Sequence, residues 1–251
     1  MGNLKIVEVT GVTGSGKTSF INEVDRLSSQ CDYKIAIVNE YGIYSNYSSS
    51  IHSQYFLKNI NKSTSKTRSL IIDIIIIPHL FNLKSIKLIL FVLQNIFLSP
   101  DKFFSKLNIL RNSLKRIGLY NILNKMKPKS ELDCIFLDEG ILHLAHNIFI
   151  NDFKKPSLKS LSEFLSKVPL YDFTMLIKAD KNMLVSVLSK RRHKRVKKDR
   201  DSKNNYISNA ITVFNHIESD PRLNENLIKI KRNNLKSVDD LNSLLKKILN
   251  I

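Results

Sequence analysis

The 251-residue sequence contains only two cysteines, Cys31 and Cys134. They do not have the spacing of metal ligands, and Cys134 lies within an apolar run typical of a strand. We interpret both as free thiols of a reducing compartment, because structural disulfides belong to oxidising ones. No secretory signal pattern precedes the first apolar run, and Ile6 stands where a myristoylation signal has Ser or Thr. These absences predict a cytoplasmic protein.

The sequence lacks any stretch rich in Pro, Gly and Ser that would separate the chain into two halves. Its 251 residues exceed the commonest domain size, so one core that carries an elaboration is the simplest interpretation. We therefore predict a single domain over residues 1–251, with a helical insertion at about 45–130 and a lid at about 190–204.

Acidic residues are scarce, since 22 Asp and Glu stand against 40 Lys and Arg and give a formal net charge of +18. Such a charge favours a polyanionic partner, either nucleic acid or a membrane surface. The chain is also rich in Lys, Asn and Ile and poor in Gly and Ala, a bias that the codons of an AT-rich genome produce on their own. Nucleic acid is therefore an alternative partner that is not favoured.

No hydrophobic run is long enough to span a membrane. The most apolar stretch, residues 70–98, is interrupted by Asp73, Pro78 and two lysines, and its longest uncharged part covers residues 88–98. A span requires about 20 apolar residues. A buried helical layer is the favoured interpretation, and a surface helix that contacts a membrane peripherally or binds a partner is the alternative. Further along, an apolar helix face is predicted by the spacing of Phe103, Leu107, Leu110, Leu114 and Ile117.

A complete phosphate-binding motif stands near the N-terminus, between an apolar run and a segment with helical periodicity. In this pattern glycines let backbone N–H groups turn toward the phosphates, Lys17 reaches the β- and γ-phosphate oxygens, and the Thr18 hydroxyl ligates Mg²⁺. The positive N-terminal end of the following helix adds to the same anion site. The motif predicts a site for ATP or another nucleoside triphosphate with Mg²⁺, formed by Gly11, Val12, Thr13, Gly14, Ser15, Gly16, Lys17, Thr18 and Ser19.

Short β-rich runs alternate with helical patterns along the chain, which predicts an α/β fold with a parallel sheet covered on both faces. Ligands of such sheets bind beyond the carboxyl ends of the strands. The predicted strands are residues 4–9, 33–38, 132–137, 173–177 and 227–230, and the second of them leads into a loop at 39–42.

Acidic residues that follow predicted strands are candidates for phosphoryl-transfer chemistry. Asp138 ends the third strand and is expected to hold Mg²⁺ directly or through water, with Glu139 as the alternative occupant of that role. A helix cap or a turn is the other interpretation of Asp138. Glu40 ends the second strand, where a carboxylate can face the hydroxyl of an acceptor, and an exposed loop position is the alternative.

A dense basic run, residues 190–200, follows the predicted helix after the fourth strand. Such runs are usually solvated faces, but a lid over the triphosphate is favoured equally by the position of this one. Arg191, Arg192 and Arg195 are better candidates than the lysines, because a guanidinium binds two phosphate oxygens at once. Asn233, just beyond the fifth strand, is a weaker candidate for contact with the nucleotide base.

His143 and His146 stand three residues apart, a spacing that puts both on one face of a helix. No third ligand accompanies them, so a surface position or a contact with substrate is favoured over metal binding.

This arrangement resembles the nucleoside and nucleotide kinases of the phosphate-loop superfamily, in particular the thymidylate kinase-like group. The resemblance rests on residues 11–18, on Asn39-Glu40, on residues 137–140, on Pro169 to Asp172, and on Arg191 to Arg195, where those kinases carry lid arginines. It implies a three-layer sandwich with a five-stranded parallel sheet of order 2-3-1-4-5, and an acceptor bound over the insertion. It also implies an ATP- and Mg²⁺-dependent kinase with Lys17, Glu40, Asp138, Arg191 and Arg195 as catalytic residues.

The sequence differs from thymidylate kinases at two points. Glu139 stands where they have Arg, and Tyr41-Gly42 stands where they have Pro and Gly. The residues that recognise thymidine monophosphate are thus missing, and we expect a divergent relative that acts on another small-molecule or nucleotide acceptor.

Three further classes stay open. A GTPase would carry Asp-x-x-Gly where this chain has residues 138–140, one residue short, and Asn-Lys-x-Asp where Ile177 replaces the Asn. A polynucleotide kinase or nucleic-acid-dependent ATPase would use the net charge, but no closely spaced aromatic residues accompany the basic run. A non-catalytic nucleotide-binding module is the third alternative.

Overall fold

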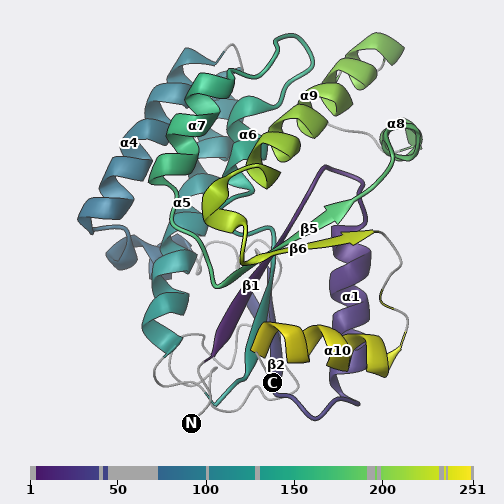
Figure 1. Ribbon diagram of the computed structural model, residues 1–251. Helices are drawn as coiled ribbons and strands as arrows, with labels where there is room; N and C mark the ends of the chain where they lie inside the picture. The colour runs from purple at the N-terminus through teal and green to yellow at the C-terminus, as the bar shows by residue number, and fades with distance from the viewer. Residues whose placement is uncertain are drawn as a thin grey trace.

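The computed structural model describes residues 4–39, 42–44, 73–99, 102–127, 131–190, 196, 199–231, 235 and 237–249. Its centre is a six-stranded sheet with the strand order β3-β2-β4-β1-β5-β6 (Figure 1). The strands are β1 (Lys5–Thr10), β2 (Ile35–Asn39), β3 (Gly42–Tyr44), β4 (Cys134–Asp138), β5 (Phe173–Lys178) and β6 (Leu227–Lys231).

Five strands run parallel, and without β3 their order is the predicted 2-3-1-4-5, with β1 between β4 and β5. The sixth strand was not predicted. β3 pairs antiparallel with β2, with Asn39 opposite Gly42, where the sequence indicated only a loop. Three residues are too few to show the alternation by which a strand is recognised.

Helices cover both faces of the sheet and give the predicted three layers (Figure 1). One face carries α1 (Lys17–Ser28) and α10 (Val238–Leu249). The other carries α5 (Phe103–Met126), α6 (Leu144–Phe149), α7 (Leu158–Lys167) and α9 (Arg200–Glu218). Outside this layer α4 (Leu83–Leu98) packs on α5 and α7, and α8 (Lys181–Lys190) follows β5. Two short 3-10 helices, η2 (Ile77–His79) and η4 (Pro221–Leu223), complete the described elements.

The alternation of side chains along β1 decides which residues reach each layer. Val7 and Val9 are buried with the residues of α1 and α10, whereas Ile6 is buried with the helices of the opposite layer. Because side chains alternate along a strand, Glu8 shares the face of Ile6 and points toward the α5 and α6 layer. An acidic side chain is thereby placed inside the protein, next to the phosphate-binding motif.

Long helices lie in the predicted insertion, but the apolar face expected on α5 is only partly correct. Ile117 is buried as expected, whereas Phe103 and Leu107 are exposed, and the buried residues nearest the start of the helix are Ile109 and Ser113. Exposed Phe104 lies beside Phe103. The periodicity is helical over its full length, but the first turns of α5 lie beyond the layer that packs on the sheet. A pattern in the sequence cannot show where the neighbouring layer ends.

Among the described residues, no single helix is both long and apolar enough to cross a membrane. Helical residues Asp73–His79 and α4 reach that length and composition only as a pair, and the chain bends by 119° between them. Residues 45–72, predicted as the start of the insertion, lie outside the described residues.

Candidate functional site

The phosphate-binding motif forms the turn between β1 and α1. Gly11, Gly14 and Gly16 have φ angles of 146°, 87° and 103°. Residues other than glycine rarely adopt such backbone angles. A Cβ atom on Gly11 would lie 2.6 Å from the carbonyl oxygen of Ile177 at the end of β5, and one on Gly14 would lie 3.0 Å from Val187 of α8. Both glycines are thus required by backbone conformation and by close packing against the neighbouring elements.

The loop is built to receive an anion. It is closed by a hydrogen bond of 3.0 Å from the Ser15 N–H to the Val12 carbonyl, and α1 begins directly after Gly16. Helix N-termini leave N–H groups without partners and carry a partial positive charge. The Ser15 hydroxyl is buried and has no hydrogen-bond partner among the described residues. These groups fit the phosphates of a nucleotide.

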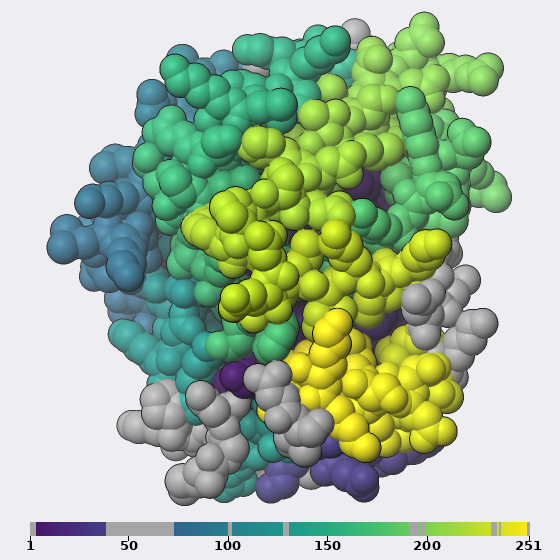
Figure 2. Space-filling view, in the orientation of Figure 1, coloured from purple at the N-terminus to yellow at the C-terminus, as the bar shows by residue number. Residues whose placement is uncertain are grey.

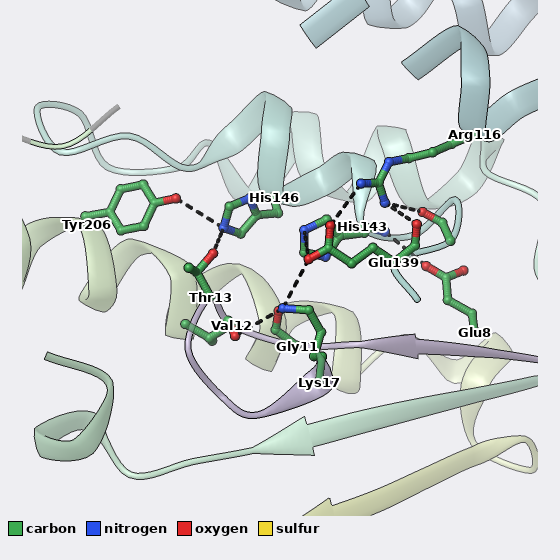
Figure 3. Close-up of polar contacts among 11 residues, drawn as sticks. Glu8, Gly11, Val12, Thr13, Lys17, Arg116, Glu139, His143, His146 and Tyr206 are labelled. Carbon is green, nitrogen blue, oxygen red and sulfur yellow. Dashed lines mark hydrogen bonds and ion pairs between the residues drawn. The ribbon is translucent and has the colours of Figure 1, made fainter. Parts of the chain in front are cut away.

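Lys17 is held at the mouth of the loop. Its side chain is buried, and its ammonium donates to the carbonyl oxygens of Gly11 at 3.0 Å and Val12 at 3.3 Å. The same nitrogen lies 3.4 Å from Oε1 of Glu139 (Figure 3). Without a nucleotide, the lysine charge is therefore balanced by the loop and by one carboxylate.

Arg116 of α5 fixes the position of Glu139. Its Nη2 lies 3.0 Å from Oε2 of Glu139, and its Nη1 donates to the carbonyl oxygens of Glu139 and, at 3.0 Å, of Gly140. Glu139 itself has a φ of 64°, the only positive value at a non-glycine residue in the described part of the chain. A left-handed residue costs about 1 kcal/mol, and such strain is concentrated at functional sites.

The charges around Glu139 decide its ionisation. Burial raises the pKa of this carboxyl, but the neighbouring His143, Lys17 and Arg116 together outweigh burial and hold the pKa well below its usual range. Burial lowers the pKa of His143 well below its usual range, and the charges of Lys17 and Arg116 add to the effect. A neutral His143 with its proton on Nε2 can donate to Oε1 of Glu139, which lies 3.3 Å away.

The buried carboxylate of Glu8 binds the backbone that follows Glu139. Its side chain is fully buried, and its carboxylate accepts hydrogen bonds from the N–H groups of Leu142 and His143, both at 3.1 Å. Gly140 lies against it, because a Cβ there would come within 2.6 Å of the carboxyl carbon of Glu8. Burial raises the pKa of Glu8 to about 7, although these hydrogen bonds favour the charged form. The chain from Glu139 to His143 is thus held by Arg116 on one side and Glu8 on the other.

A second polar contact joins the loop to α6 and α9. Nε2 of His146 lies 2.8 Å from the Thr13 hydroxyl and 3.2 Å from the hydroxyl of Tyr206 on α9 (Figure 3). The rings of His143 and His146 stack with their centroids 4.7 Å apart. Both histidines are buried, so the predicted surface position is wrong. They pack at the base of the phosphate loop.

The two predicted magnesium ligands lie at this edge of the sheet. Thr18 is exposed in the first turn of α1, and Asp138 ends β4 opposite Val9 of β1. The described residues hold no group of three or more His, Cys, Asp or Glu that could bind a metal ion alone. One hydroxyl and one carboxylate nevertheless fit Mg²⁺, since this ion keeps several waters and takes other oxygen ligands from phosphates.

The phosphate loop lies at the base of a hollow on the surface. In Figure 2, dark purple atoms of the N-terminal segment are visible between α8 in green and α9 in yellow-green. The contact of Gly14 with Val187 brings α8 to one side of the loop, and the Thr13, His146 and Tyr206 contacts bring α9 to the other. A ligand on the loop would be bordered by these two helices.

Several predicted site residues lie outside the described part of the chain: Glu40, Arg191, Arg192, Arg195 and Asn233. β2 ends one residue before Glu40, and α8 ends one residue before Arg191. Residues 200–204, the end of the predicted lid, form the first turn of α9, which Asp199 caps with a hydrogen bond of 2.8 Å from Ser202.

Asp172 is one of the residues on which the resemblance to the kinases rests. Its contacts lie away from the phosphate loop. Its carboxylate accepts from the Ile6 N–H at 2.8 Å and pairs with Lys127 at 2.7 Å. Ile6 lies near the start of β1 and Asp172 directly precedes β5, so this contact belongs to the amino ends of the strands. It ties the end of the insertion to the sheet.

The residues that sequence reasoning missed are Glu8 and Arg116. Glu8 had a signal, since an isolated acidic residue within an apolar strand pattern must find buried partners. Arg116 had none, because it is one of many basic residues in a helix of unknown orientation.

The chain matches no protein-family model and no curated protein in sequence. Among solved structures it is similar to thymidylate kinase from Ehrlichia chaffeensis, with 100% of both chains covered, 11% sequence identity and a TM-score of 0.47. The sheet order and the glycine-rich loop between β1 and α1 show an α/β fold with five parallel strands and a phosphate-binding loop after the first strand.

Proposed function

We propose that this protein is a Mg²⁺- and ATP-dependent phosphotransferase, a divergent kinase that acts on a small-molecule or nucleotide acceptor. In the reaction, an acceptor hydroxyl or phosphate oxygen forms a bond to the γ-phosphorus of ATP. The bond from that phosphorus to the bridging oxygen breaks, ADP leaves, and an acceptor hydroxyl loses its proton to a base. A cytoplasmic, reducing compartment is supported by Cys31 and Cys134, which are both free thiols.

One observation carries the proposal: Lys17 and a carboxylate-bearing strand end meet at a loop built for an anion. The loop supplies positive-φ glycines and a helix N-terminus, and β4 brings Asp138 and Glu139 beside β1. Phosphoryl transfer requires little beyond positioned phosphates, a metal ion and compensating cations. The described residues offer a candidate for each of these requirements.

Each residue has a defined task in this proposal. Lys17 binds the β- and γ-phosphate oxygens, and Thr18 with Asp138 holds Mg²⁺, which supplies charge neutralisation for the transferred group. Glu139 and Arg116 orient Lys17 before nucleotide binds. Glu40 accepts the acceptor proton, and Arg191 and Arg195 close over the phosphates; these three tasks rest on the sequence.

A transfer assay tests the proposal. Wild-type protein is incubated with γ-labelled ATP, Mg²⁺ and a panel of mononucleotides, nucleosides, sugars and short oligonucleotides. We expect label on a small acceptor, and we expect Glu40→Gln to lower turnover while nucleotide affinity stays nearly unchanged. Label found only on oligonucleotide ends would instead support a polynucleotide kinase. ATP binding without any transfer would support a non-catalytic nucleotide-binding module, and preference for GTP without transfer would support a switch protein.

A further inference from the structure

Exposed apolar side chains of the described residues are concentrated in one region, where η2, α4 and the start of α5 meet. In the part of the chain that the structure describes, thirteen large hydrophobic residues are exposed, and all but Phe153 and Leu158 lie between residues 74 and 107. We call this region the α4–α5 surface. It comprises Ile74, Ile77, Phe81, Leu83, Ile86, Leu90, Phe97, Leu98, Phe103, Phe104 and Leu107. Contiguous exposed apolar patches mark interaction sites.

α4 is apolar on two sides. Its inner side buries Leu88, Val92 and Ile96 against α5 and α7, as a core helix does. Its outer side carries Ile86, Leu90 and Phe97, spaced so that they share one face of the helix. Figures 1 and 2 show α4, in blue, at the outer margin of the molecule on the left. A helix that only completed the core would have a polar outer face.

The α4–α5 surface contains a pocket of about 180 Å³ between the two helices. It is lined by Leu93, Ile96, Phe97, Phe103, Lys106, Leu107 and Leu110. The Lys106 ammonium donates to the carbonyl oxygen of Phe97 at 2.9 Å and joins the end of α4 to the start of α5. This hydrogen bond holds the end of α4 and the start of α5, which carry the apolar side chains, in a fixed relative position.

Between positions 74 and 107, the charged residues that the structure describes are all lysines. Lys84, Lys87 and Lys102 are exposed beside the apolar side chains, and Lys106 lies in the pocket. No described residue from 74 to 127 is acidic. Apolar side chains with lysines at their margin are the composition of helices that lie in the interface of an anionic bilayer. A docking face for a second copy of this chain would place these lysines against one another.

We propose that the α4–α5 surface docks onto a membrane that contains anionic lipids, with its apolar side chains in the headgroup region and its lysines on the lipid phosphates. This proposal goes beyond the phosphotransferase function and does not rest on it. The bent arrangement of Asp73–His79 and α4 suits contact along one leaflet.

Vesicle sedimentation tests the proposal on the full chain. Vesicles of phosphatidylcholine alone are compared with vesicles of phosphatidylcholine and phosphatidylserine. We expect the wild type to sediment with the mixed vesicles and to stay in solution with the neutral ones. The variant L90E/F97E should bind at least about tenfold more weakly, since two anchoring side chains are lost. K84Q/K87Q should bind about thirtyfold more weakly, because each lysine near an anionic surface contributes about fivefold.

Matched variants keep the result interpretable. F153E/L158E changes two exposed apolar residues outside this surface, 57% and 45% exposed against 67% for Phe97 and 60% for Leu90, and should bind like the wild type. K159Q/K181Q is the matched control for the loss of charge, because both lysines are exposed outside the α4–α5 surface, and it should also bind like the wild type. All variants should keep the wild-type thermal melt. The proposal is wrong if the wild type ignores both vesicles, if L90E/F97E binds like F153E/L158E, or if L90E/F97E only converts a dimer to a monomer.

Discussion

The ammonium of Lys17 and the carboxylate of Glu139 lie 3.4 Å apart across the mouth of the phosphate loop. Glu139 is therefore the carboxylate that partners the Lys17 ammonium in this structure. Binding a nucleotide would exchange one anionic partner of Lys17 for another, so the lysine charge is kept balanced in both states. This relationship sets the expectations for variants of both residues.

Removing the Lys17 side chain should weaken nucleotide binding strongly. We expect Lys17→Ala to lower the affinity for a Mg-ATP analogue roughly 100-fold or more, because the phosphates lose a charged hydrogen-bond donor in a buried site. Titration calorimetry measures the effect, with Lys247→Ala as the control, since Lys247 is exposed on α10 far along the chain. Equal affinities of wild type and Lys17→Ala would show that the loop does not bind the nucleotide as proposed.

Substitutions of the neighbouring residues Asp138 and Glu139 should have different effects on the Mg²⁺ dependence of the reaction. Asp138→Asn should cut phosphoryl transfer severely and shift the Mg²⁺ concentration at half-maximal rate upward, because the proposed Mg²⁺ ligand loses its charge. Glu139→Gln should keep the wild-type Mg²⁺ dependence, since Glu139 faces Lys17 and Arg116. Rate measurements over a Mg²⁺ series decide, and the reverse result would assign the metal to Glu139.

Glu139→Gln should instead lower stability. The guanidinium of Arg116, 14% exposed, would keep its charge and lose its anionic partner. Because the Glu139 side chain is 34% exposed, solvent reduces the effect to about 1–3 kcal/mol of unfolding free energy. Urea unfolding of Glu139→Gln and of the control Glu23→Gln on α1, whose partner Arg26 is 56% exposed, provides the comparison. Equal midpoints would show that the Arg116 contact contributes nothing.

The buried Glu8 predicts a pH-dependent stability. Its pKa is 4.5 in an unfolded chain and about 7 in the folded protein, so the native state holds a proton that the unfolded state releases. The stabilisation is fully present below about pH 4.5 and is lost as pH rises through about 7, a change of about 3 kcal/mol.

Glu8→Gln tests this window. The amide does not titrate, so the variant should gain about 2.5 kcal/mol relative to wild type between about pH 5 and about pH 8. Urea unfolding of both proteins over that range measures the difference, in which the other titrating groups cancel. A constant difference would show that Glu8 keeps an ordinary pKa.

The packing of α5 on Ile76, the residue before η2, can be tested through Gly118. A Cβ on Gly118 would overlap the side chain of buried Ile76. Gly118→Ala should therefore destabilise by about 1–3 kcal/mol, although alanine normally favours a helix. In the double variant with Ile76→Ala, the space left by isoleucine should accept the methyl group, so the two effects should not add. Additive unfolding free energies would contradict this packing.

Much of the fold was predictable because it depends on local patterns. The parallel strands follow from apolar runs bounded by turn residues, and the phosphate loop follows from Gly11 to Thr18. β3 was missed because its antiparallel pairing with β2 requires the chain to reverse after Asn39, and no local sequence pattern shows that reversal. The exposed start of α5 was missed because periodicity shows a helix face but not what covers it.

The sequence predicted which strand ends and which loop form the site, but it predicted fewer of the contacts between their side chains. Asp138 and Glu139 were placed near the loop by strand order alone, which parallel topology fixes. The choice of Glu139 as the partner of Lys17 depends on its left-handed backbone and on Arg116, which joins the site from a helix more than twenty residues earlier. Likewise, the contact between Thr13 and His146 requires the packing of α6 on the loop.

The two edges of the sheet also bear on how the molecule avoids self-association. Open strand edges are templates for pairing with another chain, and short strands and lysines are the usual protection. β3 covers β2 with only three residues, and β6, at the opposite edge, carries exposed Lys229 and Lys231. A protein that exposes apolar helices can thus stay free of strand-mediated aggregation, and its contacts are directed to its helical side.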